Sequence, residues 1–280
     1  MLRIVTDGGA DMPERWADEY DIHVLPMCVR FGEQVFFPGI DLSKTAFYQK
    51  VIEKRQLPKS SVPSPLEVKQ FLCKIAEKGD SILSINLASR LSGTLNVFRL
   101  AAEELREEFN ITIFDSCAGS AALGFMCREA RLMNRRGLSL QTIIERLEVI
   151  RKQLTVIFTV NTLEFAYLSG RVNLLQSAVS SLLNIKPIIT LRDGLLQMSE
   201  KVRTRQKSLD RVVECVKERV GSKKVNVAVV HAADPEIAAR MVDMVRKFLN
   251  IQELVVSELS IPVAANLGPG TVGIVAYPED

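Results

Sequence analysis

Residue types that build metal, disulfide and redox sites are scarce in this chain. Its 280 residues include five cysteines and two histidines, and no two cysteines form a CxxC pair. A zinc centre needs three or four such ligands, usually grouped at short spacing. The sequence therefore predicts no metal site and no cofactor, and its scattered cysteines are typical of free thiols in a reducing compartment.

Long apolar runs are absent as well. No run approaches the roughly 18 apolar residues that mark a membrane helix, and the opening residues MLRIVTD lack the pattern of a secretion signal. Mean hydropathy is nevertheless slightly positive, at +0.12. We therefore expect a cytoplasmic globular protein without a membrane span, and with an interior slightly more apolar than average.

Aromatic residues and net charge are both low. Aromatics make up 6% of the chain, with a single tryptophan, and the formal net charge is +3. Nucleic-acid-binding proteins usually gather basic and aromatic side chains on one surface, so we expect no nucleic-acid partner. The motifs GxSxG, HExxH and GxxxxGK[ST] are missing too, which excludes the common hydrolase and P-loop signatures.

The sequence does contain a regular alternation of short β-type runs and helical patterns. Strands are predicted at Leu2–Thr6, Ile22–Pro26, Ile82–Asn86, Ile111–Phe114, Thr155–Thr159, Pro187–Leu191, Leu195–Met198, Val225–Val230, Leu254–Leu259 and Ile274–Tyr277. Helices are predicted at Pro65–Lys78, Thr94–Glu108, Ala118–Arg136, Ser139–Gln153 and from Asp234 to about Phe248. Such alternation favours an α/β architecture.

Two domains are expected, and the best boundary lies at Gln153-Leu154. Residues 1–153 alternate regularly between strands and helices, which is typical of a mostly parallel sheet flanked by helices. In residues 154–280 the strands are denser, and Gly194 marks a hairpin. We therefore expect a mixed α/β domain there.

One glycine motif, Gly268-Pro-Gly270-Thr-Val-Gly273, has the spacing of a dinucleotide fingerprint. That fingerprint requires a strand before it and a helix after it, whereas this run precedes a predicted strand. The context favours a tight glycine turn, or a turn whose amides face an anion.

Two hydroxyl-rich loops lie where helices begin. Ser60, Ser61 and Ser64 precede one helix, where Ser64 and Glu67 predict a capping box, and Ser92 and Thr94 open another. Serine and threonine at these positions either cap the helix or join its free N–H groups in binding a carboxylate or phosphate.

Several charged residues also admit two interpretations. Gly170-Arg171 indicates a turn before a helix, with Arg171 either solvated or clamping a carboxylate. Lys201–Lys207 is either a solvated helix start or a docking surface for an acidic partner. Asp7, Asp11 and Asp115 either cap turns, which is the commoner role, or bind a metal.

Taken together, these segments resemble the DegV family along nearly the whole chain. The opening strand and loop are similar to the family's IVTDSTADLP, and Leu91-Ser92-Gly93-Thr94 matches LSGT. The remaining matches, in chain order, are Val24–Pro26 with Phe31-Gly32, Ser60–Pro65, Asp115-Ser116 with Ser120 and Gly124, Leu163–Val172, Leu182–Ile188 and Gly268–Gly270.

The resemblance implies a two-domain DegV-like fold with a long-chain fatty acid in an apolar tunnel between the domains. It implies that hydroxyls of Ser60 and Ser92 hold the carboxylate, with Ser61, Gly93 and Thr94 beside them. It further implies a carrier without catalysis of its own, which presents the carboxylate to a separate ATP-dependent fatty acid kinase in phospholipid metabolism.

The sequence departs from the family pattern near the expected carboxylate site. Asn266 stands where the family often has histidine, two residues before the GPG run. An amide donates a hydrogen bond but carries no charge, so we expect Arg171 or neutral donors to compensate, or the headgroup to be held more weakly. Arg203, with Arg205, lies in a stretch similar to one implicated in kinase docking.

Two other functions stay open. The first is a small acyl-processing enzyme with Ser92 as nucleophile, although only His23 and His231 could serve it as a histidine base. The second is a lipid-binding regulatory module that has no kinase partner.

Overall fold

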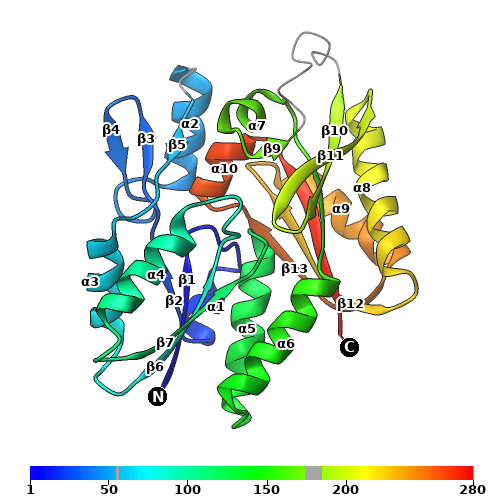
Figure 1. The fold of residues 1–280 in the computed structure, drawn as a ribbon. Helices are drawn as coiled ribbons and strands as arrows, with labels where there is room; N and C mark the ends of the chain where they lie inside the picture. The colour runs from blue at the N-terminus through cyan, green and yellow to red at the C-terminus, as the bar shows by residue number, and fades with distance from the viewer. Residues whose placement is uncertain (55–56, 174–184, 280) are drawn as a thin grey trace.

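The computed structural model describes residues 1–54, 57–173 and 185–279, and Figure 1 shows their arrangement. The expected α/β architecture is confirmed. The match predicted at Leu182–Ile188 begins before residue 185, so its first three residues lie outside the described part.

The N-terminal half is built on a four-stranded parallel sheet of order β2-β1-β6-β7. Its strands are β1 (Leu2–Asp7), β2 (Ile22–Leu25), β6 (Ser81–Asn86) and β7 (Asn110–Asp115). Helices α3 (Pro65–Ile75) and α4 (Thr94–Glu104) share a core with Val5 on one face of this sheet. Helix α5 (Ala121–Arg135) shares a core with Ile4 on the other face, so both faces are covered, as a parallel sheet requires.

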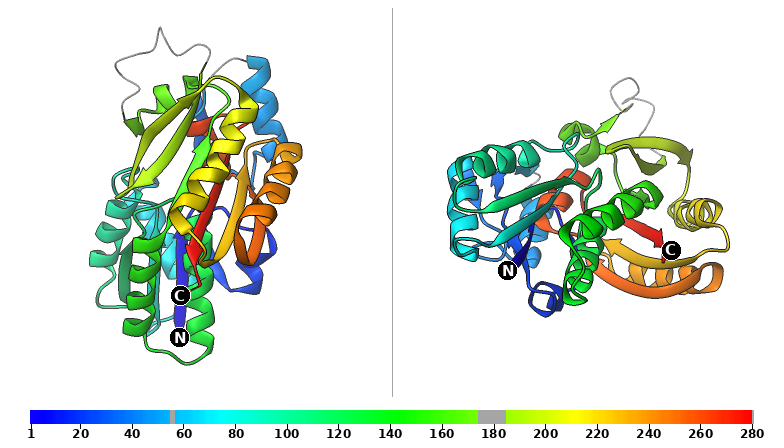
Figure 2. Two further views of the ribbon diagram at one scale, coloured as in Figure 1. Left: turned by 90° about the vertical axis from the view of Figure 1, so that its right-hand side faces the viewer. Right: turned by 60° about the horizontal axis from the view of Figure 1, so that its bottom comes forward.

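The C-terminal half is built on a seven-stranded mixed sheet of order β13-β12-β14-β8-β10-β11-β9. Its strands are β8 (Thr155–Thr159), β9 (Val172–Asn173), β10 (Lys186–Arg192), β11 (Leu195–Val202), β12 (Lys224–His231), β13 (Asn250–Glu258) and β14 (Val272–Pro278). Helices α8 (Arg205–Val220) and α9 (Pro235–Phe248) cover its outer face around Ile157. Figures 1 and 2 show both helices on the side away from the first sheet.

The inner face of the seven-stranded sheet turns toward the N-terminal half. Val156 and Phe158 on that face share one continuous core with α5, α6 (Leu140–Gln153) and α10 (Ile261–Leu267). The strands before Gln153 thus belong to the N-terminal sheets and those after it to the seven-stranded sheet. The domain division at 153 and 154 remains a prediction.

Several short elements escaped sequence-based prediction. A small antiparallel sheet of order β4-β3-β5 joins β3 (Val29–Phe31), β4 (Gln34–Phe36) and β5 (Lys59–Ser60). The other unpredicted elements are β9, α10, α1 (Arg15–Glu19), α2 (Lys44–Lys54) and α7 (Glu164–Ser169), and of α8 only a possible start within Lys201–Lys207 was predicted. Most are too short to show a hydrophobic period, which is the main signal for such elements.

Helix ends follow their capping residues. In α3 the Ser64 hydroxyl accepts from the Glu67 amide at 3.2 Å, and the Glu67 carboxylate accepts from the Ser64 amide at 2.6 Å, which confirms the capping box. The helix ends at Ile75 rather than Lys78, α4 ends at Glu104 rather than Glu108, and α5 begins at Ala121 rather than Ala118. Among the described residues, no helix is both long and apolar enough to cross a membrane.

Candidate ligand pocket

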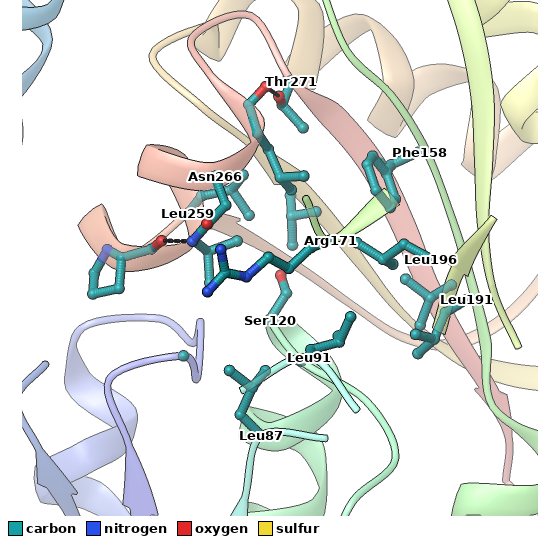
Figure 3. A pocket seen from close by; sticks show the side chains of 18 of the residues that line it. Leu87, Leu91, Ser120, Phe158, Arg171, Leu191, Leu196, Leu259, Asn266 and Thr271 are labelled. Carbon is teal, nitrogen blue, oxygen red and sulfur yellow. Dashed lines mark hydrogen bonds between the residues drawn. The ribbon is translucent and has the colours of Figure 1, made fainter. Parts of the chain in front are cut away.

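A largely apolar pocket lies between the two sheets, beside α10. It encloses about 1000 Å³ of empty space, counting the open solvent at its mouth. One wall is the inner face of the seven-stranded sheet, including Val156, Phe158 and Val275, and Leu87 and Leu91 come from the N-terminal half. Figure 3 shows these leucines across the pocket from Phe158.

Gly273 lies on the strand β14 beside Phe158 of β8, and it lines the same wall. A Cβ atom at Gly273 would lie 2.5 Å from the Phe158 Cβ atom, so this close approach of the two strands requires glycine. The wall is therefore apolar and closely packed, and suited to an aliphatic chain rather than to a polar ligand.

Ser60 and Asn266 meet at the polar end of the pocket, although 206 positions separate them. The Asn266 Nδ2 atom donates to Ser60 Oγ at 3.1 Å and to the Pro262 carbonyl at 2.7 Å. Both protons of this amide are thus engaged, and the Ser60 hydroxyl keeps its own proton for another acceptor. Asn266 orients Ser60 in this arrangement instead of donating to a ligand itself.

Ser92 also lines the pocket, at the start of α4. Its Oγ lies 2.8 Å from Thr94 Oγ1 and accepts from the Thr94 amide at 3.3 Å. The N-cap of α4 is Gly93, and no side chain caps the helix, so the capping interpretation is wrong for Ser92 and its hydroxyl faces the pocket. Ser61 lines the pocket too, whereas Gly93 packs beside Val62 and Thr94 is buried, and neither of these two is among the residues that line it.

Arg171 is exposed and lines the pocket. In the view of Figure 3 its side chain extends toward the end at which Asn266 lies. Its guanidinium donates to the Ser169 carbonyl. The expected turn before a helix is wrong here, because Gly170, with φ of 68°, ends α7 and β9 follows.

The two predicted docking arginines differ in their surroundings. Arg203 is exposed, whereas Arg205 is half-buried and donates to the Gly270 carbonyl at 2.5 Å. A carboxylate oxygen of Asp234 lies 3.7 Å from the same Arg205 nitrogen, and burial lowers the pKa of this guanidinium. Arg205 therefore fixes the turn that follows α10, and Arg203 is the more accessible cation.

The predicted glycine turn is confirmed. Gly268 and Gly270 have φ of 82° and 75°, values that L-residues rarely adopt, and the turn leads from α10 into β14. The Gly270 amide donates to the Ala232 carbonyl at 2.8 Å and so serves the protein's own backbone rather than an anion.

The predicted aspartates bind backbone and hydroxyl groups. Asp7 accepts from the Gly9 and Leu87 amides, each at 2.9 Å, and Asp115 accepts from the Cys117 amide at 2.9 Å. Burial raises the pKa of Asp7, against the effect of these hydrogen bonds. The turn-capping interpretation is therefore confirmed for both, and no cluster that could hold a metal ion is found among the described residues.

Neither histidine belongs to the pocket. His231 Nδ1 accepts from the Asp234 amide at 3.3 Å, and His23 Nε2 lies 3.4 Å from Asp21 Oδ1. Within the described residues, the pocket lining includes neither ring, so Ser92 has no histidine base beside it.

Sequence reasoning assigned no role to Ser120, although this serine lines the pocket. Its backbone has φ of 59°, uncommon for a residue other than glycine, and its amide donates to the Gly9 carbonyl at 2.8 Å. The only sequence signal was its place in the segment beginning Asp115-Ser116.

The fold and the pocket define an α/β protein with a largely apolar binding site at the junction of two sheets. Residues 1–279 match the model of a family whose description is "Uncharacterised protein, DegV family". The chain belongs to the DegV family. A DegV domain-containing protein of Halalkalibacterium halodurans is 31% identical over 280 residues, which cover 99% of each chain.

Solved structures agree with this assignment. A Thermus thermophilus DegV family protein, described by its fatty acid binding, is 28% identical with a TM-score of 0.90, and 99% of each chain is covered. DegV of Bacillus subtilis, described as a fatty acid binding protein, is 29% identical with a TM-score of 0.87, again over 99% of each chain.

Proposed function

We propose that this protein binds a long-chain fatty acid, with the tail in the apolar pocket and the carboxylate at its polar end. The observation that carries the proposal is one continuous pocket that joins an aliphatic wall to the hydroxyls of Ser60 and Ser92. The fatty acids bound by the Thermus and Bacillus relatives support it.

The apolar wall supplies most of the affinity in this account. Burying one CH₂ group contributes about 0.8 kcal/mol, so a tail of roughly 15 carbons contributes on the order of 12 kcal/mol before the costs of association. Few polar contacts are then needed, and their task is to orient the carboxylate and keep it from being buried unpaired.

The carboxylate receives its hydrogen bonds from two loops of the N-terminal half. Ser60, oriented by Asn266, donates from one side, and Ser92 donates from the start of α4, with Ser61, Gly93 and Thr94 beside them. Arg171 supplies the positive charge that Asn266 lacks. The N-terminal end of α4 adds a favourable dipole for an anion.

The second part of the proposal concerns a partner. The protein acts as a carrier subunit without catalysis of its own and presents the carboxylate to a separate ATP-dependent fatty acid kinase. Arg203, which is exposed, contributes to docking, while Arg205 nearby donates to the Gly270 carbonyl. Because the kinase needs ATP, this role belongs in the cytoplasm.

Organic extraction of the purified protein followed by mass spectrometry tests the binding step. About one long-chain fatty acid per chain is expected. Recovery of no lipid, together with acyl hydrolysis that disappears in Ser92→Ala, would favour an acyl-processing enzyme instead.

Addition of a fatty acid kinase catalytic subunit and ATP tests the carrier step. Formation of acyl phosphate only when this protein is present supports it. Bound fatty acid without acyl phosphate would indicate a lipid-binding regulatory module.

A further inference from the structure

A buried carboxylate, Asp11, joins three segments beside the pocket. The loop after β1 carries it, and its side chain accepts a hydrogen bond from the Ser120 hydroxyl through one oxygen. The other oxygen accepts from the Ser260 amide at 2.6 Å. Only 2% of Asp11 is exposed, so neither hydrogen bond competes with bulk water.

The hydrogen bond from Ser260 links Asp11 to the wall of the pocket. Ser260 is the residue immediately before α10, and its own hydroxyl caps no amide of that helix. Helix α10 carries Pro262, Val263 and Asn266, all of which line the pocket. A carboxylate of the N-terminal half therefore holds the start of the helix that walls the pocket and orients Ser60.

The partner at Ser120 ties the same carboxylate to the pocket lining directly. Ser120 keeps its unusual backbone conformation while its amide bonds the Gly9 carbonyl and its hydroxyl bonds Asp11. Strained residues of this kind persist where the surrounding contacts determine them, and they gather at functional sites. The loop of Asp11 is itself confined, because a Cβ atom at Gly124 of α5 would lie 2.6 Å from the Asp11 carbonyl oxygen.

Hydrogen bonds and one cation stabilise the charged form of Asp11 against its burial. Burial raises the pKa of Asp11, whereas the bonds from Ser120 and Ser260 and the charge of Lys44 on α2 lower it, and Lys44 also lies 3.4 Å from Glu258. Tyr48, on the same helix, is also buried nearby, and its hydroxyl has no partner within the described residues. The carboxylate thus lies among polar groups that belong to both halves of the protein.

We propose that Asp11 is a positioning residue of the pocket: its carboxylate holds the start of α10 against the N-terminal loops and so sets the rate at which a bound fatty acid leaves. This inference rests on the proposed function. It predicts that loss of the Asp11 contacts affects release more than it affects capture, because the carboxylate-binding serines stay in place.

Stopped-flow release of cis-parinaric acid, a fluorescent long-chain fatty acid, measures this effect. For Asp11→Ala, release about tenfold faster is expected, the equivalent of about 1.4 kcal/mol. Asp11→Asn is expected to restore most of the slow release, since its amide accepts from Ser260 and donates to the Ser120 oxygen. Wild-type release from a folded Asp11→Ala would overturn the proposal.

Arg128→Met is the matched control. Arg128 also contacts both halves, lying 4.7 Å from the centre of the Trp16 ring and pairing with Glu253 of β13, but it does not line the pocket. This variant is expected to be less stable and to release the probe at the wild-type rate. Equal acceleration in both variants would show that general loosening, and not Asp11, controls release.

Hydrogen exchange of the lipid-free protein gives a readout that does not depend on the ligand. The amides of residues 260–266 are expected to exchange faster in Asp11→Ala than in wild type, while those of α9 stay unchanged. If Asp11→Ala does not fold, Ser120→Ala removes one of the two hydrogen bonds and takes its place. Wild type that fails to bind the probe refutes the proposed function, whereas unchanged exchange in α10 refutes the role of Asp11.

Discussion

The two halves of the protein meet in two different ways. At the α5 junction, Arg128 lies between the Trp16 ring and the Glu253 carboxylate, and Arg146 of α6 bonds both Glu129 and the Glu279 carbonyl. At the α10 junction, the Asp11 and Ser60 contacts border the pocket. Multiple guanidinium contacts hold the first junction. Single hydrogen bonds and the partly exposed Lys44–Glu258 pair are the polar contacts of the second.

This difference indicates which of the two junctions can respond to a ligand. Breaking a buried ion pair costs about 3–5 kcal/mol, and a desolvated cation–π contact adds about 2 kcal/mol, whereas a hydrogen bond contributes about 1 kcal/mol between neutral groups and about 1.5–3 kcal/mol to a charged group. We therefore expect the α5 junction to maintain the fold and the α10 junction to yield first when a ligand enters. Substitutions at the two junctions should then separate stability from binding.

The largest effect on stability is expected at the α5 junction. Arg128→Met removes a guanidinium that is 11% exposed and leaves Glu253 without its partner, so unfolding should become easier by about 2–3 kcal/mol. Urea denaturation measures this change. Arg106→Met, which removes an exposed pair with Glu103, is the control and should shift stability by less than about 0.5 kcal/mol.

Gly268→Ala should weaken the α10 junction by about 1–3 kcal/mol and reduce fatty acid affinity with it. The substitution adds a Cβ atom at a backbone φ of 82°, only 2.5 Å from the Phe165 ring. Gly137→Ala has a similar φ of 79° with nothing within 4 Å of the added atom, and it serves as the control. Equal loss of affinity in both variants would contradict a specific role for the turn after α10.

Ser60→Ala and Ser92→Ala should each lower fatty acid affinity about tenfold, since each removes one hydrogen bond to a charged group. Calorimetric titration measures the affinity, and stability should change little. Ser139→Ala is the opposite case: its hydroxyl accepts from the Thr142 amide at 3.1 Å and caps α6, so this variant should lose about 1 kcal/mol of stability and no affinity.

The smallest effect is expected from pH. Burial lowers the pKa of His231 below 6.5, against the opposing effect of Glu258, and its neutral ring accepts from the Asp234 amide. The folded state therefore favours the neutral ring. The contribution of this ring to the free energy of unfolding is fully present above pH 6.5 and is lost as the pH falls toward the pKa of the folded state.

Thermal unfolding of wild type and His231→Asn at pH 7.5 and 5.5 measures this contribution. The stability difference between the two proteins should shrink at the lower pH. A difference that is independent of pH would show that His231 does not titrate with unfolding.

Local features of the fold could be predicted from the sequence, because they depend on neighbouring residues. The capping box of Ser64 and Glu67 fixed the start of α3, and Gly268 with Gly270 marked the turn before β14. The parallel strands were visible as apolar runs. Short elements such as β3 and α10 could not be found, since few residues carry their pattern and distant contacts hold them.

Of the candidate site, too, only the residues in local motifs could be predicted from the sequence. Ser60 and Ser92 could be selected because each lies in a hydroxyl-rich loop at the start of a helix. The hydrogen bond from Asn266 to Ser60 and the contact of Asp11 with Ser260 join residues more than 200 positions apart, and no local pattern encodes them. The contact of Arg205 with the Gly270 carbonyl could not be predicted for the same reason, since Gly270 lies in a distant turn, and the docking role of Arg205 stays a prediction.

We propose above all that the fatty acid carboxylate lies between Ser60 and Ser92. The most direct test is the ¹³C spectrum of carboxyl-labelled palmitic acid bound to wild type, Ser60→Ala and Ser92→Ala. One bound carboxyl resonance is expected at about one ligand per chain, and it should be displaced in each serine variant. A bound resonance that neither substitution moves would place the carboxylate elsewhere and contradict this position.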